Sequence, residues 1–420
     1  MGMTITEKIL AKKSGREQVA PGDLVTVDVD TVIFVDTNFV PSRWREILKI
    51  PHPERVVVVL DHRAPAATQQ CAAMHQTARE FAARFGITRF HDIGYQQGIS
   101  HQLVADHAYA LPGTVLLCSD SHTGSAGVFN CLGRGVGALD VVYAATKDET
   151  WFMVGETVRY ELEGRLASGV TAKDAFLHIA GKYGDHVTQN VEYGGPAMAG
   201  LGISARKTLT TMSTELSAEF AVFDPDAVME DWIRARSAAP FESVRADGDA
   251  QYAALRVVNL SALEPLVAYP DSVVGNSQPV GAAAGTKIDQ AFVGSCANGT
   301  LEDLELVAQV IGGRRVHERV RFIVTPGSQT VYREASRRGI ISTLVEAGAV
   351  VTNATCGVCC GGHLGVLGPN ETCITASTRN FKGRMGHTSA RIFMASPATV
   401  AASALKGVIT DPREFLTREA

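Results

Sequence analysis

Short runs of hydrophobic, mostly β-branched residues alternate along the chain with segments of helical periodicity. Six of these runs predict buried strands: Arg55–His62, Thr114–His122, Gln290–Cys296, Arg321–Gly327, Gly348–Asn353 and Glu371–Ser377. Continuous apolar strands of this length are typical of parallel sheets that are covered on both faces. The pattern therefore predicts the α/β class, with largely parallel sheets.

Two helices can be placed by their first turns. The apolar residues of Thr300–Ile311 fall on one helical face, and Thr300 with Asp303 forms a start similar to a capping box. Thr4 and Glu7 have the same spacing, so we expect a short helix near the N-terminus. Helices in these positions fit the alternation of strands and helices that an α/β protein requires.

The middle of the chain differs from its two ends. Residues 156–258 carry more charge and fewer continuous strand signals than the parts on either side, which hold the clustered cysteines and histidines. The glycine-rich segment 193–202 within this stretch is predicted to be a loop. We therefore expect three domains, at residues 1–155, 156–258 and 259–420.

Polar and potentially reactive residues stand where several predicted strands end: Asp61, His62, Asp120, Ser121, His122, Cys296 and Arg379. In open α/β sheets, ligands bind beyond the carboxyl ends of the strands. The repeated placement therefore predicts a functional site at these strand ends.

Composition narrows the possible partners and the compartment. The 420 residues have a net charge of −5, and without a basic excess a nucleic acid is not expected as the main partner. No apolar run approaches the roughly 20 residues that span a bilayer, and the N-terminus lacks the features of a signal peptide. We expect the cytoplasm, where thiols stay reduced and clustered cysteines are metal ligands or catalytic groups more often than disulfides.

The eight cysteines fall into two kinds. Four are isolated or lie within a strand pattern and are expected to be small buried hydrophobic residues: Cys71, Cys118, Cys131 and Cys373. Cys356 and Cys359 form a C-x-x-C in a glycine-rich turn, with Cys360 beside them, and Cys296 lies in a polar loop between a strand and a helix. These thiols are the candidates for chemistry.

Spacing alone leaves three readings of these thiols open. A structural zinc site takes four protein ligands, for which His363 could join the C-x-x-C pair. A thioredoxin-like pair would open a helix after a strand, whereas glycines and a further cysteine follow this one. An iron–sulfur cluster held by Cys296, Cys356 and Cys359 would leave one iron open as a Lewis acid.

Four segments then resemble the aconitase family: Cys118–Val141, Phe292–Ile311, Cys356–His387 and Ser396–Leu405. The likeness extends in order through the whole chain, and it is greatest to the large subunits of 3-isopropylmalate dehydratase and homoaconitase, in their shorter archaeal-type form. It implies a three-domain, aconitase-like α/β core that lacks the swivelling fourth domain, and an iron–sulfur hydro-lyase of hydroxy di- or tricarboxylic acids.

The resemblance also implies roles for individual residues. Three cysteines match the ligands of a [4Fe–4S] cluster with one open iron site: Cys296, Cys356 and Cys359. Three carboxylate–histidine pairs match a catalytic acid network, in which the first protonates the departing hydroxyl: Asp61 with His62, Asp120 with His101, and Glu215 with His122. Further residues fall where substrate is bound: Arg379, Arg384, Ser121, Thr378 and Thr300.

Dehydration of a hydroxy acid needs an electrophile for the leaving oxygen, a proton for it and a base for the carbon acid. In the family this base is a serine on the swivelling domain. The resemblance therefore implies a separate small subunit that carries that domain, in a heterodimer or a heterotetramer. The chain alone is expected to be inactive.

Five positions depart from the family pattern. Ala297 and Thr300 stand where threonine and arginine are usual, Thr378 and Thr211 replace asparagines, and Cys360 replaces an aliphatic residue. Loss of arginine at position 300 removes a positive charge. A smaller hydroxy diacid therefore competes with 3-isopropylmalate as the expected substrate: a methylmalate or malate interconverting with citraconate or maleate, or a dimethylmalate. Homoaconitase activity and a non-catalytic iron or redox sensor are the remaining alternatives.

Overall fold

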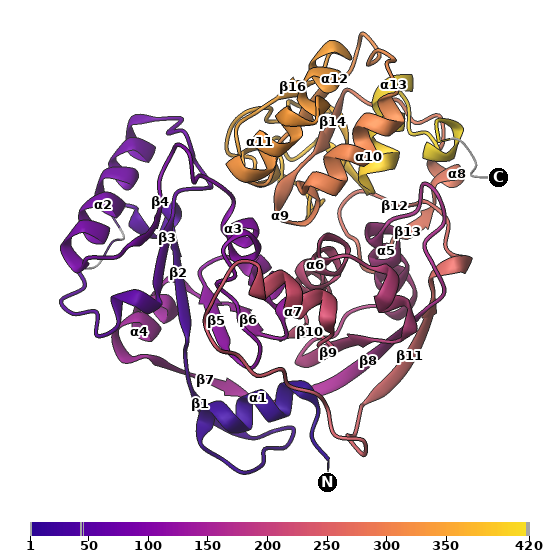
Figure 1. Cartoon of the computed structure of the whole chain (residues 1–420). Coiled ribbons are helices and arrows are strands. Elements are labelled where there is room, and N and C mark those ends of the chain that lie inside the picture. The colour runs from indigo at the N-terminus through magenta and orange to yellow at the C-terminus, as the bar shows by residue number, and fades with distance from the viewer. Residues whose placement is uncertain (1, 43, 45, 417–420) are drawn as a thin grey trace.

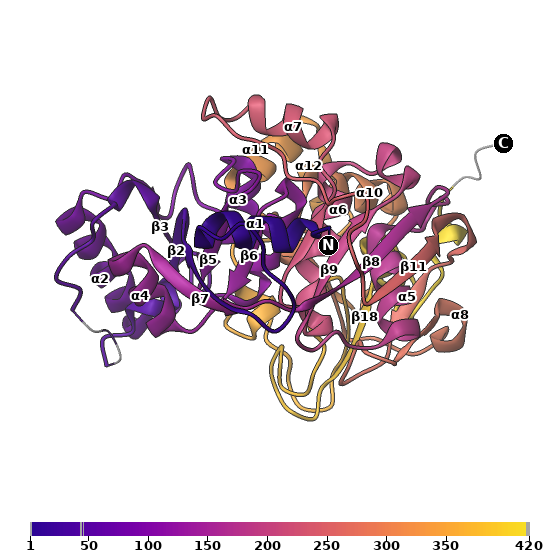
Figure 2. The same ribbon diagram turned by 90° about the horizontal axis from the view of Figure 1, so that it is seen from below.

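The computed structural model describes residues 2–42, 44 and 46–416. Three sheets of at least four strands follow one another along the chain, each with its own helices (Figure 1). Seen from below, the first sheet lies on the left and the other two lie on the right (Figure 2). Most strand pairs are parallel, so the predicted α/β class with largely parallel sheets is confirmed.

The first sheet has five parallel strands in the order β4-β3-β2-β5-β6. Their bounds are β2 Thr31–Val35, β3 Val56–Val59, β4 Arg89–His91, β5 Val115–Cys118 and β6 Leu132–Gly135. Alternate side chains of β2 face opposite sides: Val32 and Phe34 enter one core, and Ile33 and Val35 enter another. Both faces are covered, which explains why these strands read as continuous apolar runs.

Helices cover both faces of the first sheet. Their bounds are α2 Gln69–Phe85 and α4 Ala138–Lys147 on one face, and α3 Ser100–Asp106 and the 3₁₀ helix η3 Ser121–Phe129 on the other. Near the N-terminus, α1 (Ile5–Ser14) begins with the capping box of Thr4 and Glu7, which confirms that prediction. An antiparallel ribbon of β1 (Leu24–Asp28) and β7 (Glu149–Met153) lies beside α1.

The second sheet has four parallel strands in the order β10-β9-β8-β11. Their bounds are β8 Glu156–Glu163, β9 Gln189–Gly194, β10 Ala221–Phe223 and β11 Ala254–Asn259. This sheet is more regular than the sparse strand signals indicated. The strand signals are sparse because charged side chains within the strands interrupt the apolar pattern. Arg159 is an example, and it is paired with Asp224 and Glu161.

Two helices cover the core face of the second sheet, and a third packs back on the first sheet. The bounds are α5 Ala172–Tyr183, α6 Ile203–Met212 and α7 Ala227–Arg234. The segment 193–202, predicted as a loop, contains the end of β9 and the 3₁₀ helix η4 (Pro196–Gly200). A Cβ at Gly127 would lie 1.6 Å from the carbonyl oxygen of Ala221, so only glycine allows η3 to approach β10 this closely.

The third sheet has seven strands in the order β13-β12-β18-β17-β14-β15-β16. Their bounds are β12 Leu266–Ala268, β13 Ser277–Pro279, β14 Gln290–Val293, β15 Arg321–Val324, β16 Val350–Val351, β17 Thr372–Thr375 and β18 Arg391–Ala395. β12 pairs antiparallel with both β13 and β18, and the other described pairs of this sheet are parallel. Each of the six predicted strands contains one observed strand.

The two faces of the third sheet are covered differently. Helices cover one face: α8 Val280–Ala283, α10 Leu301–Ile311, α11 Gln329–Arg337, α12 Ile340–Glu346 and α13 Pro397–Lys406. Thr300 caps α10 through the predicted capping box with Asp303. On the other face, Phe292 packs against Val358 and Leu367, which belong to the loop that carries the clustered cysteines. That loop is therefore anchored to a hydrophobic core.

Short helices connect the remaining segments: α9 Ser295–Asn298, η1 Asp36–Phe39, η2 Pro53–Arg55, η5 Ser213–Leu216, η6 Leu260–Ala262, η7 Gly357–Cys360 and η8 Pro412–Glu414. The four cysteines expected to be buried are buried. Among the described residues, none of the helices has the length and apolar character needed to cross a bilayer. Residues of α6 and α7, which lie among the strands of the second sheet in the sequence, also belong to a hydrophobic core of the first sheet. The division into three domains therefore stays a prediction.

Candidate active site

The carboxyl ends of three neighbouring strands bring four polar side chains together. Asp36 follows β2, Asp61 and His62 follow β3, and Asp120 follows β5. Because β3, β2 and β5 are adjacent and parallel, their ends meet at one edge of the sheet. This is the place at which open α/β sheets bind ligands.

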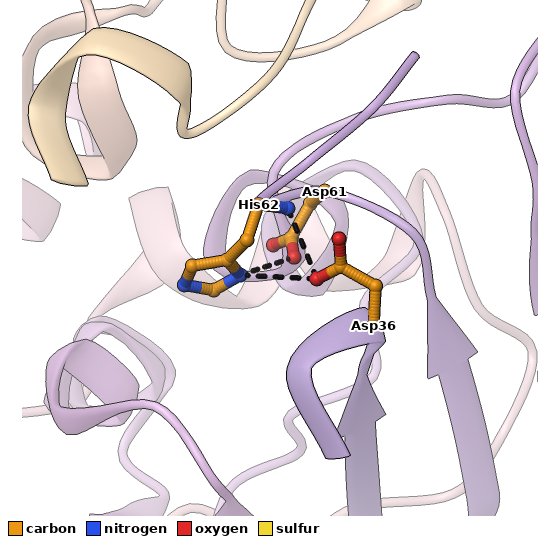
Figure 3. Close-up of side chains that lie close together, drawn as sticks. All are labelled: Asp36, Asp61 and His62. Atoms are coloured by element: carbon orange, nitrogen blue, oxygen red, sulfur yellow. Dashed lines mark hydrogen bonds and ion pairs between the residues drawn. The ribbon is translucent and has the colours of Figure 1, made fainter. Parts of the chain in front are cut away.

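His62 is surrounded by carboxylates. Its Nδ1 lies 2.7 Å from Asp61 Oδ1 and 3.5 Å from Asp36 Oδ1. Figure 3 shows both aspartates directed at this one nitrogen, while the other nitrogen of the ring points away from them. That second nitrogen, Nε2, lies 3.2 Å from Asp120 Oδ2. Burial disfavours the imidazolium, but the charge of Asp61 and the bonds to the three carboxylates hold the pKa of His62 well above its usual value.

His101 is brought to the same edge by α3. The backbone N–H of Ser100 donates to Asp61 Oδ2 at 2.8 Å, which fixes the first turn of this helix. His101 Nε2 then lies 2.7 Å from Asp120 Oδ1, the pairing that the resemblance implied. Burial raises the pKa of Asp120, but His101, His122 and His62 outweigh it and hold that pKa well below its ordinary value.

The third pair joins parts of all three sheets. His122, at the start of η3, has its Nε2 2.9 Å from Oε1 of Glu215, which lies in η5 after α6. Arg379, which follows β17, donates from Nε to the same carboxylate oxygen at 2.7 Å. Burial opposes both charges, yet this contact and Asp120 raise the pKa of His122, and His122 with Arg379 lowers that of Glu215.

The clustered cysteines face this network from the third sheet. Cys296 lies in α9 directly after β14, next to Ser295, whose backbone has a left-handed φ of 77°. Such strained residues persist where the surrounding structure holds them, and they concentrate at functional sites. Cys356 and Cys359 lie in the turn after β16. In Figure 1, α9 lies between the third sheet and the helices α3 and α6 below it.

Two hydrogen bonds tie the cysteine turn to the first sheet. The backbone N–H of Cys356 donates to the carbonyl oxygen of Asp61 at 2.8 Å, and Thr355 Oγ1 donates to the same oxygen at 2.6 Å. Since Asp61 and His62 are consecutive, these bonds fix the cysteines relative to the acid network. The site is thus one assembly built from segments far apart in the sequence.

The thiol donors fit an iron–sulfur cluster better than a single zinc ion. Among the described residues, the group whose metal-binding atoms all lie within 4.8 Å of one another is Asp36, Asp61 and His62, and it contains no cysteine. Zinc–sulfur bonds of about 2.3 Å require the sulfurs to be within roughly 4.6 Å of one another. A cluster of several irons separates its thiolates further, and soft sulfur donors suit it.

Polar groups also reach the sulfur of Cys359. Thr378 Oγ1 lies 3.6 Å from this Sγ, and Arg384 Nη2 lies 3.8 Å from it. Hydrogen bonds to the sulfurs are among the features that set the potential of an iron–sulfur centre. The structure therefore brings Thr378 and Arg384 to the cysteine side of the site, whereas Arg379 lies on the histidine side.

Other positions expected to bind substrate or to depart from the family pattern have different surroundings. Thr300 Oγ1 donates to Asp303 Oδ2 at 2.6 Å within the capping box of α10. Ser121 is exposed beside His122, and its carbonyl oxygen accepts from Thr214 Oγ1 at 3.0 Å. Thr211 is buried without a described partner for its hydroxyl, and Cys360 donates to the carbonyl oxygen of Gly357 at 3.3 Å.

Three charged residues at this site were missed by the sequence reading. Asp36 follows an apolar strand as Asp61 does, so the strand-end pattern could have found it; its carboxylate also lies 3.6 Å from His75 Nε2. Lys173 and Lys207 are buried close to the cysteine loops. Nothing in the local sequence marks them, because lysines on amphipathic helices are normally exposed.

Proteins of the aconitase type match the sequence of this chain over nearly its full length. The sequence model of the aconitase family (aconitate hydratase) matches residues 36–280 and 274–407. The 3-isopropylmalate dehydratase large subunit of Mycolicibacterium smegmatis is 48% identical and covers 100% of this chain and 99% of that protein. The probable methanogen homoaconitase large subunit of Methanothermobacter thermautotrophicus is 41% identical, with 98% of both chains covered. The 3-isopropylmalate dehydratase large subunit 1 of Methanopyrus kandleri is 39% identical over 99% of this chain and 100% of that protein.

These matches agree with the α/β fold of the chain. They confirm the resemblance to the family and the prediction of a hydro-lyase. Members of the family carry iron–sulfur clusters, which is consistent with the three thiols on the third sheet. The chain belongs to the aconitase family.

Proposed function

We propose that this chain is the large, cluster-bearing subunit of a hydro-lyase that interconverts a hydroxy diacid and the unsaturated acid formed by loss of water. The first candidate substrate is 3-isopropylmalate, which is consistent with the names of several relatives. The observation that carries the proposal is the hydrogen-bonded network around Asp120, to which the turn of Cys356 is tied through Asp61.

The cofactor in this proposal is a [4Fe–4S] cluster held by Cys296, Cys356 and Cys359, with one iron left open. When bound, the cluster supplies a Lewis acid for the hydroxyl and carboxylate oxygens of the substrate. The soft sulfur donors of the three thiols and the contacts of Thr378 and Arg384 with Cys359 support this assignment.

His62 is the proton donor in this proposal. Asp61 and Asp36 at Nδ1 favour the imidazolium, so that Nε2 carries a proton at neutral pH. Without substrate this proton is directed at Asp120, 3.2 Å away. The hydroxyl oxygen of the substrate has to replace that contact before it receives the proton and leaves as water. Asp120, which stays bonded to His101, keeps the negative charge beside the reacting group.

Arg379 is suited to hold a carboxylate of the substrate. Glu215 binds it through Nε, which leaves its two terminal nitrogens without a hydrogen-bond partner among the described residues. A guanidinium whose plane is fixed in this way can bind a carboxylate with two parallel hydrogen bonds. Ser121, exposed beside His122, offers a further hydrogen bond.

We propose that a separate small subunit completes the enzyme. It would carry the swivelling domain with the serine that removes the proton from carbon, in a heterodimer or heterotetramer. The designation of the relatives as large subunits supports this partner. All eight cysteines are free thiols, which supports a reducing compartment such as the cytoplasm.

A smaller hydroxy diacid is the second candidate substrate. Thr300 brings no positive charge to a position where the family pattern implied by the resemblance has arginine, and its hydroxyl is used by the cap of α10. One cation fewer favours a dicarboxylate over a tricarboxylate. A methylmalate or malate, interconverting with citraconate or maleate, is therefore preferred over homoaconitate as the alternative to 3-isopropylmalate.

The test is anaerobic co-expression of this chain with a small subunit, followed by analysis for iron, sulfide and zinc. Ultraviolet absorbance then follows the conjugated double bond of each unsaturated acid: isopropylmaleate, citraconate, maleate and homoaconitate. We expect iron and sulfide in the protein and hydration of isopropylmaleate or of a smaller diacid. A His62→Asn complex serves as the control that retains the cofactor without the proton donor.

Stoichiometric zinc without sulfide in the anaerobic protein would overturn the cofactor assignment. A cluster-bearing complex that hydrates none of the four acids would overturn the proposed reaction. Activity of the isolated chain equal to that of the complex would overturn the need for the small subunit.

A further inference from the structure

Two lysines are buried at the boundary between the second and third sheets. Lys173, the second residue of α5, is 0% exposed, and Lys207, in the middle of α6, is 1% exposed. Among the described residues, neither ammonium group pairs with a carboxylate. A buried charge without a counter-charge is strongly unfavourable. The position of Lys173 adds to this cost, since a cation in the first turn of a helix opposes the helix dipole.

Lys173 contacts the segment that leads to the cysteine side of the site. Its Nζ donates to the carbonyl oxygens of Ala376 at 3.1 Å and Ser377 at 2.8 Å, and it lies 3.4 Å from the sulfur of Met212. The residue that follows Ser377 is Thr378, whose hydroxyl contacts the sulfur of Cys359. The ammonium group is thus separated from that sulfur by one short turn of backbone.

Lys207 is similarly close to the loop that carries Cys296. Its ammonium group donates to Oε1 of Gln102. The hydroxyl of its neighbour Thr208 donates to the carbonyl oxygen of Ala297 at 2.9 Å, directly after Cys296. The two lysines therefore lie behind two of the three candidate ligands, one behind Cys359 and one behind Cys296.

The nearest carboxylates have partners of their own. Glu215 is bound to His122 and Arg379. Asp106 accepts from Gln102 at 2.8 Å and from Ser328 at 2.6 Å. Asp303 is used by the cap of α10 and by Asn298. Each of these carboxylates is therefore engaged by other side chains, and among the described residues none of them is in direct contact with either ammonium group.

Cysteine sulfurs lie close to both lysines and become negative groups once they bind a metal cluster: Cys296 and Cys359 for Lys173, and Cys296 for Lys207. Burial lowers the pKa of Lys173 to about 8, whereas Cys296 and Cys359 act in the opposite direction. Burial likewise lowers the pKa of Lys207, and Asp106 and Cys296 oppose it. Bound thiolates carry negative charge, so a cluster in this position would supply the missing counter-charge.

We propose that Lys173 and Lys207 are positioning residues that balance the negative charge of the cluster from behind its ligand loops, and thereby raise its reduction potential and retain it in the protein. This inference rests on the proposed function, because it assumes that the three cysteines hold an iron–sulfur cluster. Net charge and hydrogen bonds around a cluster are among the quantities that set its potential.

The test compares Lys173→Gln and Lys173→Met in the reconstituted, cluster-bearing complex. Glutamine keeps a hydrogen-bond donor for the carbonyl oxygens of Ala376 and Ser377 but loses the charge, whereas methionine loses both. The midpoint potential is measured by redox titration followed by electron paramagnetic resonance. We expect both variants to shift it to a more negative value, because the oxidised cluster is the less negatively charged form.

Cluster retention and stability of the apo-protein give two further measurements. Loss of iron to a chelator should be about 10- to 100-fold faster in both variants, as for other groups that support a metal site. The apo-protein should melt at the same or a higher temperature, since the substitution removes an uncompensated buried charge. Lys182→Gln, at an exposed position of the same helix, is the control and should leave potential and retention unchanged.

Lys207→Gln and Lys207→Met repeat the comparison at the second lysine if the Lys173 variants do not fold. A glutamine variant with the wild-type potential and iron retention would overturn the inference, because the hydrogen bonds alone would then explain the lysine. Destabilisation of the apo-protein equal to that of the cluster-bearing protein would also overturn it. A wild-type chain without iron and sulfide would instead overturn the proposed function.

Discussion

The two sides of the candidate site are held in different ways. On the side of the first sheet, direct hydrogen bonds of 2.7 to 3.2 Å join His62 and His101 to Asp61 and Asp120. On the side of the third sheet, the sulfur of Cys359 is contacted by Thr378 Oγ1 at 3.6 Å and by Arg384 Nη2 at 3.8 Å, distances that are normal for hydrogen bonds to sulfur. The acid network is formed by carboxylates and histidines of the protein itself, whereas the cysteine side is, in the proposed function, the part that holds a cluster.

This difference follows from how each side is built. Asp36, Asp61 and Asp120 stand at the ends of adjacent parallel strands, where the sheet itself sets their separation. Cys296 and Cys356 lie on loops of the third sheet and are fixed by ties to other elements, such as the bond from Cys356 to the carbonyl oxygen of Asp61. Preorganised donors that need no rearrangement are what acid catalysis requires.

The largest expected effect is on the cysteine side. Cys359→Ser should remove iron and sulfide and reduce activity of the assembled enzyme by about 1000-fold or more, since a Lewis acid contributes several kcal/mol. Iron content, visible absorbance and the rate of hydration measure it. Cys360→Ala is the matched control and should keep its iron. A Cys359→Ser protein with a full complement of iron would show that this thiol is no ligand.

On the histidine side, His62→Asn should slow the reaction without loss of the cluster. We expect kcat/KM to fall by about 100- to 10,000-fold, as for loss of a general acid, with iron content unchanged. His178→Asn, on the half-buried face of α5, is the control for loss of an imidazole outside the site. Iron loss in proportion to activity would mean that the two sides are not independent.

Glu215→Gln tests the contacts that Glu215 makes with His122 after β5 of the first sheet and with Arg379 after β17 of the third. In the folded protein the pKa of His122 is raised and that of Glu215 is lowered, so each group favours the charge of the other. Their stabilisation is lost as the pH rises through the raised pKa of His122, and also as it falls through the lowered pKa of Glu215. Glutamine should therefore lower the pKa of His122 and move the alkaline limb of the pH–rate profile to lower pH.

The same substitution releases Arg379, so we also expect KM to rise by about tenfold, corresponding to roughly 1.4 kcal/mol of binding. The conservative control is Glu215→Asp, which keeps the charge on a shorter side chain and should restore part of the profile. An unchanged alkaline limb in the glutamine variant would exclude His122 as the group that sets it.

The smallest effect is expected at Thr300. Its hydroxyl caps α10, so Thr300→Ala should lower the free energy of unfolding by about 1 kcal/mol and leave KM unchanged. Thr300→Ser keeps the cap and serves as the control. Chemical denaturation and steady-state kinetics distinguish the two roles. A rise in KM with unchanged stability would restore the substrate-binding role implied by the resemblance.

Much of the fold could be predicted because its signals are local. The apolar runs located strands such as β3 and β5, and the capping boxes located the starts of α1 and α10. The strands of the second sheet were harder to predict, because charged residues such as Arg159 interrupt the apolar pattern of β8. Arg159 is paired with Glu161 in the same strand and with the distant Asp224. Alternation of polar and apolar residues carries no information about such partners.

The candidate site divides in the same way. Strand ends in the sequence indicated Asp61, His62, Asp120 and Cys296, and the same rule would have found Asp36. No local pattern could have found Lys173 or Lys207, because the residues that bury and contact each lysine come from distant segments of the chain. Apart from Asp36, the charged residues that sequence reasoning missed are thus those whose surroundings are assembled from far along the chain.

The sequence by itself determined the local elements and the chemistry available at their ends, because helix and strand periods, caps and reactive side chains are properties of short segments. Only the tertiary structure decided which of these groups meet. His122 and Glu215 are 93 residues apart, and Thr355 and Asp61 are 294 apart. Contacts over such separations arise from the packing of whole sheets, and the same packing places two lysines behind the cysteine loops.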